Sequence, residues 1–104
     1  MLVERETFRA KYGRGDELMS LFKDGALLEQ LRQPGTGAIR LYADFTGPMF
    51  TVQFEQEFDD LDSYARNTRR KHEYFGSPEF QFWFARMMDC VEAGERQLLS
   101  VEAV

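Results

Sequence analysis

The chain has 104 residues and a mass of 12.2 kDa, which predicts a single domain over residues 1–104. Hydrophobic residues make up 43% of the chain and aromatic residues 14%, and this much apolar surface excludes a disordered protein. The formal net charge of −5 repels phosphate backbones and argues against a nucleic-acid partner.

A single cysteine and a single histidine restrict the metal and redox chemistry of the chain. Cys90 has no partner for an internal disulfide, and Cys90 and His72 are too few to build a metal site. We therefore expect no metal and no cofactor. The first ten residues mix charged and apolar side chains, unlike a signal peptide, and no apolar run is long enough to span a membrane. The sequence predicts a soluble cytoplasmic protein without a membrane partner.

A strand is predicted over residues 2–10, although the pattern leaves open which of its faces turns toward the core. A helix is predicted next, over residues 16–31, with Asp16 as its N-cap and Gly25 within its apolar stripe. Because glycine disfavours a helix interior, the Asp24-Gly25 pair is expected to bend or interrupt this helix.

Two alternating segments on either side of Thr46-Gly47-Pro48 predict a β-hairpin. A two-residue turn at Thr46-Gly47 would place Leu41 opposite Val52 and Tyr42 opposite Thr51. One face of the hairpin is apolar and carries Ile39, Leu41, Ala43, Phe45, Phe50, Val52 and Phe54. The other face is mostly polar and carries Arg40, Tyr42, Asp44, Met49, Thr51, Gln53 and Glu55.

Two helices and a last strand complete the predicted order. Asp59 is expected to cap a helix that ends at Gly76 and turns His72 toward the sheet. Ser77-Pro78-Glu79 is a typical helix start, and the helix that it opens is expected to reach Gly94. Residues 95–103 are predicted to form a strand. The order βαββααβ predicts a ferredoxin-like α+β fold, a four-stranded antiparallel sheet with helices on one face.

The opening strand with its YGRG turn, the GAIRLYADFTGPMFTVQFEQEF hairpin and the aromatic helix before the last strand resemble the dimeric α/β-barrel superfamily. Within it, the chain is most similar to NIPSNAP-like and antibiotic-biosynthesis-monooxygenase-like small proteins. The resemblance implies a homodimer whose sheets close into a barrel. For an enzyme, it implies cofactor-independent oxidation or isomerisation, and it transfers no catalytic residue. The haem-binding branch is the least similar, since His72 would have to be the axial ligand.

The polar hairpin face is too rich in functional groups for plain solvent surface. If a second copy covers it, a pocket for a small organic molecule is expected there, lined by Arg40, Tyr42, Thr51 and Gln53. The first strand would add either Arg5 or the pair Glu4 and Glu6 to this pocket, depending on which way the strand is turned. Trp83 lies partly off the core stripe of its helix, which predicts a place at a dimer interface or a ligand channel.

If the protein is an enzyme, Arg40 would stabilise an enolate, Tyr42 would orient it and His72 would move a proton. The alternative is a non-catalytic dimerisation or partner-binding module whose interface is filled by the same side chains. In that case His72 is a hydrogen-bonded, half-buried residue. The basic residues Arg66, Arg69, Arg70 and Lys71 are expected on a solvated helix face, and Cys90 in the core.

Overall fold

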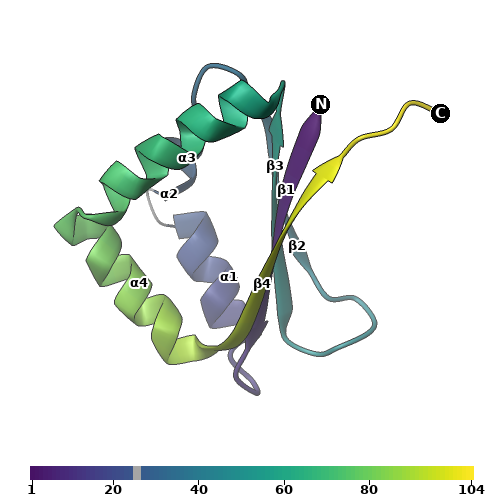
Figure 1. Ribbon diagram of the computed structural model, residues 1–104. Coiled ribbons are helices and arrows are strands. Elements are labelled where there is room, and N and C mark those ends of the chain that lie inside the picture. The colour runs from purple at the N-terminus through teal and green to yellow at the C-terminus, as the bar shows by residue number, and fades with distance from the viewer. Residues whose placement is uncertain (25–26) are drawn as a thin grey trace.

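The computed structural model describes residues 1–24 and 27–104, in which four antiparallel strands form one sheet in the order β2-β3-β1-β4. The strands are β1 (Leu2–Ala10), β2 (Thr36–Ala43), β3 (Thr51–Phe58) and β4 (Val91–Ser100). The helices are α1 (Gly15–Asp24), α2 (Leu27–Leu31), α3 (Leu61–Phe75) and α4 (Pro78–Cys90). All of them lie on one face of the sheet (Figure 1), which confirms the predicted ferredoxin-like fold.

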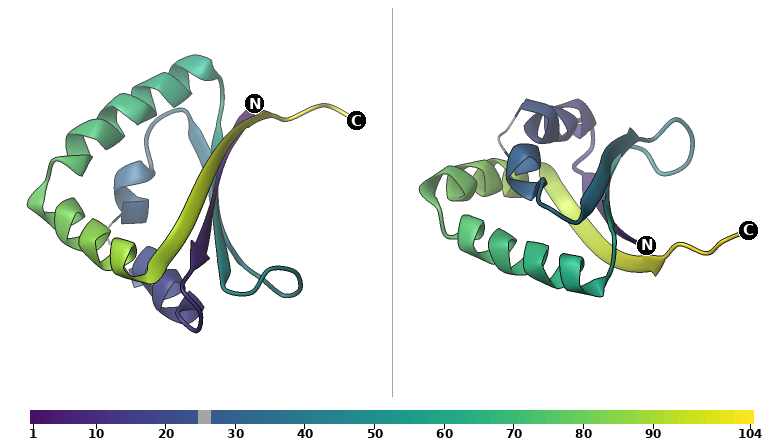
Figure 2. Two further views of the ribbon diagram at one scale, coloured as in Figure 1. Left: turned by 60° about the horizontal axis from the view of Figure 1, so that its bottom comes forward. Right: turned by 90° about the horizontal axis from the view of Figure 1, so that it is seen from above.

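Helices α3 and α4 form a wide angle over one face of the sheet. In Figure 1, α3 leaves the sheet at its upper end and α4 returns to the sheet at its lower end, so that the α3–α4 junction is the part farthest from the sheet. Helix α1 lies on the same face and contacts both α4 and the sheet. Figure 2 shows the same arrangement from two further directions, with no helix of the described residues on the other face. We call that second face the open face.

The first predicted helix is described as two helices, α1 and α2, on either side of residues 25–26. Gly25, which was placed in its apolar stripe, lies outside the described residues. Helix α1 buries Leu18, Leu21 and Phe22 against the sheet. The C-terminal end of α2 is attached to β3 and α3, because the Leu31 carbonyl oxygen accepts hydrogen bonds from the buried side-chain amides of Gln56 (2.7 Å) and Asn67 (3.0 Å).

The hairpin has the predicted faces but not the predicted register. Leu41 pairs with Phe54 and Tyr42 with Gln53, two positions away from the expected partners. The cause is a wider loop, residues 44–50, in which Phe50 adopts a left-handed backbone with φ 61° and the ladder starts only at Thr51. Because side chains alternate with period two, a shift of two residues leaves each of them on its predicted face.

Helix α3 is rotated relative to the prediction. Its N-cap is Asp60 rather than Asp59, and the Asp60 carboxylate accepts a hydrogen bond from the Ser63 backbone N–H at 2.8 Å. The side of α3 that faces the sheet lies one residue earlier than predicted, with Lys71 in place of His72, and adjacent residues of a helix point about 100° apart. The side chains of Asn67 and Lys71 therefore face the sheet, whereas His72 is exposed, and the expectation that His72 points to the sheet is wrong.

Helix α4 starts as predicted and ends earlier. The Ser77 hydroxyl accepts a hydrogen bond from the Phe80 backbone N–H at 3.2 Å, which confirms the predicted N-cap. The helix ends at Cys90 instead of Gly94, and β4 follows at once, because β1 pairs with β4 from Ala10↔Val91 onward. Cys90 is fully buried, as predicted, and burial raises the pKa of its thiol.

The hydrophobic core lies between the sheet and the helices. Its buried members are Ala10, Leu18, Leu21, Phe22, Leu27, Leu31, Val52, Phe54, Phe80, Met87 and Cys90. Within the described ranges, no helix combines the length and the apolar character needed to cross a membrane.

Candidate functional site

The orientation of β1 determines which charged side chains reach the interior. Phe8 pairs with Val52 and Glu6 with Phe54, both on the helix-covered face. Side chains alternate along a strand, so Glu4 and Glu6 face the helices and Arg5 faces the opposite way. The question that the sequence left open is thus answered: Arg5 joins the polar hairpin face, and Glu4 and Glu6 lie on the helix-covered face.

A cleft of about 410 Å³ lies between the helices and the sheet. Half of the residues that line it are aromatic and come from the sheet and from three helices, namely Phe8, Phe22, Phe54, Phe75, Phe80, Trp83 and Phe84. We call this space the inner cleft. Its volume and its mostly apolar walls are typical of sites for small organic molecules.

Trp83 has a fixed position in the wall of the inner cleft. Its indole Nε1 donates a hydrogen bond to the Leu21 backbone carbonyl at 2.7 Å, which ties α4 to α1. Its ring stacks on Phe80, with 5.8 Å between centroids, and meets the edge of Phe22 at 5.4 Å. Phe80 also stacks on Phe75 at 4.4 Å. These contacts hold the flat faces of the rings in fixed positions even when no ligand is bound.

One end of the inner cleft is charged. Glu4 is only 2% exposed, and its carboxylate accepts a hydrogen bond from Lys71 Nζ at 2.9 Å. Arg96 Nε lies 3.9 Å from the second oxygen of Glu4 and 3.5 Å from Glu6 Oε1. Burial raises the pKa of the Glu6 carboxyl, and the nearby negative charge of Glu4 raises it further. We call Glu4, Glu6, Lys71 and Arg96 the charged cluster.

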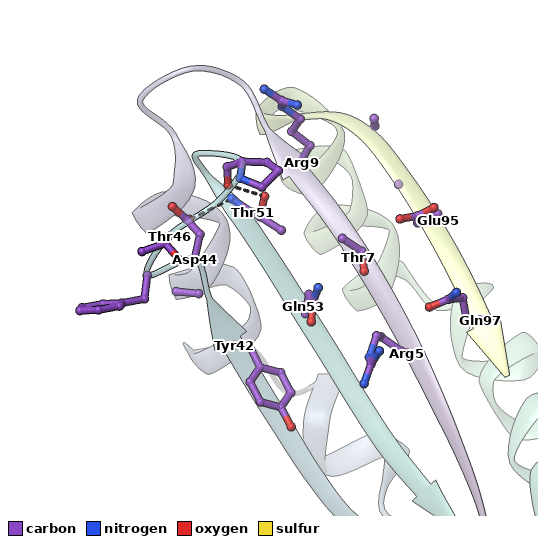
Figure 3. A pocket seen from close by; sticks show the side chains of 15 residues that line it. Arg5, Thr7, Arg9, Tyr42, Asp44, Thr46, Thr51, Gln53, Glu95 and Gln97 are labelled. Carbon is purple, nitrogen blue, oxygen red and sulfur yellow. Dashed lines mark hydrogen bonds between the residues drawn. The ribbon is translucent and has the colours of Figure 1, made fainter. Parts of the chain in front are cut away.

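The open face has a hollow of its own, of about 740 Å³, beside the β2–β3 loop. Figure 3 shows that polar side chains from neighbouring strands line it, among them Tyr42, Thr51, Gln53, Arg5 and Gln97. Because only the sheet and the β2–β3 loop bound it, a second surface would be needed to enclose a ligand there.

Next to this hollow, the charged groups of the open face bind one another. Glu55 accepts hydrogen bonds from Arg5 Nε at 2.7 Å and from the Tyr42 hydroxyl at 2.8 Å. Burial opposes ionisation of Glu55, but the hydrogen bonds from Arg5 and Tyr42 outweigh it, and the pKa of Glu55 is lowered. Arg40 Nη1 donates to Glu57 at 2.8 Å, and this hydrogen bond lowers the pKa of Glu57.

The structure divides the sequence-predicted site residues between two sides of the sheet. Tyr42, Thr51 and Gln53 line the open-face hollow together, and Arg40 lies on the same face without lining it. Trp83 lines the inner cleft on the other side. The exposed His72 lies on α3, with its ring 6.0 Å from Phe75, and is not brought together with Arg40 and Tyr42.

Sequence reasoning missed the role of the charged cluster. Lys71 was assigned to a solvated basic face, but only 11% of its side chain is exposed, and this assignment is corrected by its contact with Glu4. A usable signal was present in β1, where Phe8 and Ala10 mark the apolar face and share its period with Glu4 and Glu6. In the described part of the chain, no group of three or more His, Cys, Asp or Glu side chains is arranged to hold a metal ion.

The sheet order and the one-sided helix layer define the ferredoxin-like α+β architecture of the dimeric α/β-barrel proteins. Among solved structures, the chain is similar to an uncharacterized NIPSNAP domain protein from Burkholderia xenovorans, with 25% identity and a TM-score of 0.79 over 99% of this chain and 96% of that one. A NIPSNAP family protein from Agrobacterium tumefaciens is 19% identical, with a TM-score of 0.75 over 95% and 90% of the two chains. The predicted resemblance is confirmed at the level of structure.

SnoaB, a cofactor-independent oxygenase from Streptomyces nogalater, has the same fold at 16% identity, with a TM-score of 0.67 over 99% of this chain and 94% of that one. No family model matches the sequence, and no curated protein matches it. The likeness to SnoaB therefore concerns the fold.

Proposed function

We propose that this protein binds a flat, largely apolar organic molecule in the inner cleft, and that two copies pair through their open faces. The observation that carries the proposal is the aromatic lining of a cleft of about 410 Å³. Small-molecule sites are commonly concave, apolar spaces of roughly 300–1,000 Å³ with a few polar groups that fix orientation.

The walls favour a planar ligand over a branched or highly charged one. The rings of Phe80, Phe75 and Trp83 are already stacked or held by hydrogen bonds, so a planar guest gains ring contacts without ordering them first. The charged cluster lies at one end of the inner cleft and gives such a guest a direction. This placement differs from the sequence-based one, in which the ligand lay between the sheet and its partner.

For an enzyme, the chemistry that we propose is cofactor-independent oxidation or isomerisation. SnoaB, which shares the fold, is a cofactor-independent oxygenase, and this supports the proposal only by analogy. The proposed contacts of Arg40, Tyr42, Thr51 and Gln53 with a ligand belong to the open face and need a covering partner. A catalytic role for His72 needs a ligand that reaches the outer side of α3.

The second candidate function is a non-catalytic dimerisation module. It is favoured by one observation, the mutual pairing of Arg5, Glu55 and Tyr42 on the open face, because groups that satisfy one another can be buried in an interface without a ligand. In that case no small molecule raises the melting temperature, whereas a bound ligand raises it by mass action.

Trp83 is the only tryptophan of the chain and lines the inner cleft, so its fluorescence reports on binding directly. We expect 7-methoxycoumarin, a flat neutral probe, to quench it with saturation. Phe84→Ala should weaken this binding by about three- to tenfold, because Phe84 lines the cleft and one aromatic contact contributes about 0.5–1.5 kcal/mol.

The matched control is Phe82→Ala, two positions away on the same helix. Phe82 is 71% exposed and does not line the cleft, so its removal should leave binding unchanged. If Phe82→Ala and Phe84→Ala behave alike, or if only Tyr42→Ala weakens binding, the probe does not lie in the inner cleft and the proposal is refuted.

A further inference from the structure

The charged cluster contains two carboxylates and two cations, of which Glu4, Glu6 and Lys71 are largely buried and Arg96 is exposed. Glu4 is closest to Lys71, at 2.9 Å, and Glu6 is closest to Arg96, at 3.5 Å. When all of them are ionised, their charges sum to zero. Lys71, Arg96 and Glu6 also line the inner cleft, so this balance is in contact with whatever the cleft holds.

The two carboxylates are not equivalent. Glu4 is 2% exposed and does not line the cleft, whereas the Glu6 side chain is 21% exposed and does line it. Glu4 has Lys71 as a hydrogen-bond donor, but Glu6 has only the longer contact with Arg96. Glu6 is therefore the carboxylate that is free to accept a proton from the cleft.

We infer that Glu6 accepts a proton from a weakly acidic ligand, an enol or a phenol, which the inner cleft then holds as its anion. This inference rests on the proposed function. The ligand O–H bond breaks, its electron pair stays on the ligand oxygen, and the proton moves to a carboxylate oxygen of Glu6. No oxidant or reductant is needed.

Charge balance is the physical reason. A proton on Glu6 leaves the cluster with a net charge of +1, from Lys71 and Arg96 against Glu4, and the ligand anion then restores neutrality. Creating an uncompensated charge in a buried site is costly, but this transfer only moves a charge from one side of the cleft to the other. The raised pKa of Glu6, caused by burial and by Glu4, makes it a better proton acceptor than an ordinary carboxylate.

The remaining groups around Glu6 do not disturb this balance. Helices α1 and α2 line the cleft with Phe22, Leu27 and Leu31, and α4 adds the neutral amide of Gln81. From α3, Tyr64 lies beside Glu4, and burial and Glu4 both raise the pKa of its hydroxyl, so that it stays neutral. Glu6, Lys71 and Arg96 are thus the charged part of the cleft wall.

The experiment compares 7-hydroxycoumarin with 7-methoxycoumarin, its methyl ether, at a pH where free 7-hydroxycoumarin is mostly the neutral phenol. With the wild-type protein, the bound hydroxyl probe should absorb as the phenolate. Calorimetry in buffers of different ionisation enthalpy should find about zero protons released per bound probe, because Glu6 takes the proton.

Glu6→Gln cannot take that proton. Its cluster carries +1 permanently, so it should still bind the phenolate, now with release of about one proton to the buffer per bound probe. Glu95→Gln removes the same charge from the open face of β4 and should behave as the wild type. Arg96→Gln, at a side chain that is 64% exposed, should lower the preference for the hydroxyl probe about tenfold without loss of the fold.

Two results overturn the inference alone: the methyl ether binds but the bound hydroxyl probe absorbs as the neutral phenol, or the proton count is the same for the wild type and Glu6→Gln. If the methyl ether does not bind the wild type at all, the proposed function fails, and this inference falls with it.

Discussion

At the scale of single residues, the most consequential contact is the buried pair of Lys71 and Glu4. The two side chains are 11% and 2% exposed and lie 2.9 Å apart, although they are 67 positions apart in the sequence. A buried ion pair adds little net stability relative to an apolar pair, but removing one partner strands a buried charge. The pair therefore fixes α3 against β1 at the charged end of the inner cleft.

We expect Lys71→Met to lower the free energy of unfolding by about 3 kcal/mol, because it leaves Glu4 uncompensated except for the more distant Arg96. Urea-induced unfolding measures this loss. The double variant Lys71→Met, Glu4→Gln should recover most of it, since no buried charge remains. Equal losses in the single and the double variant would show that Lys71 stabilises the protein through packing alone.

Sequence reasoning at this scale identified residue types but not their partners. The basic run at 66–71 suggested a solvated face, and three of its members follow that suggestion in being exposed. Lys71 does not, because packing decides which side of α3 faces the sheet, and its partner Glu4 belongs to a strand whose orientation the pattern left open. The contact between these two distant segments therefore depends on the orientation of α3 and on the orientation of β1.

At the scale of elements, start signals were predicted better than ends and registers. Ser77-Pro78-Glu79 combines a side-chain cap, a first-turn proline and a first-turn acid, and α4 begins there. The pair Asp59-Asp60 offers two possible caps, of which Asp60 is used, and the face of α3 that turns toward the sheet is set by packing, which leaves no local signal. The end of α4 is set by pairing of β4 with β1, which is a long-range interaction and leaves no local signal.

The connection from α2 to β2 gives an element-scale prediction. Gly35 has φ +86°, and a Cβ atom there would overlap the Ser63 side chain of α3, whereas Gly47 has φ +95° with open space around it. We expect Gly47→Ala to destabilise the protein by about 1 kcal/mol, the usual cost of a left-handed conformation.

Gly35→Ala should cost at least about 3 kcal/mol, because the overlap with Ser63 adds to the backbone term. Thermal unfolding of the two variants side by side measures the difference. If both glycines cost the same, α3 does not pack against this turn as closely as described.

At the scale of the whole molecule, the two faces of the sheet serve two purposes in this account. One face carries the helices and the inner cleft, and the open face is polar, has charged groups that pair with one another, and carries a hollow of its own. The sequence predicted both faces and the fold, because alternation and element order are local properties. It placed the ligand on the other side of the sheet from our proposal, since a cleft under helices depends on how far α3 and α4 diverge from the sheet.

We expect the wild-type protein to sediment as a dimer at micromolar concentration. Thr7→Arg should shift it to a monomer, because a two-fold interface doubles every introduced charge and Arg5 and Arg9 already flank this position. Ser20→Arg makes the same charge change on the exposed side of α1 and should leave the dimer intact. A wild-type monomer throughout this range would contradict pairing through the open face.

The most direct test of the central claim is a crystal structure of the protein with 7-methoxycoumarin bound. We predict electron density for the probe between the rings of α4, at Phe80 and Trp83, and those of the sheet, at Phe8 and Phe54. Density for the probe on the open face beside Tyr42 and Gln53, with the inner cleft closed by its own side chains, would contradict the account.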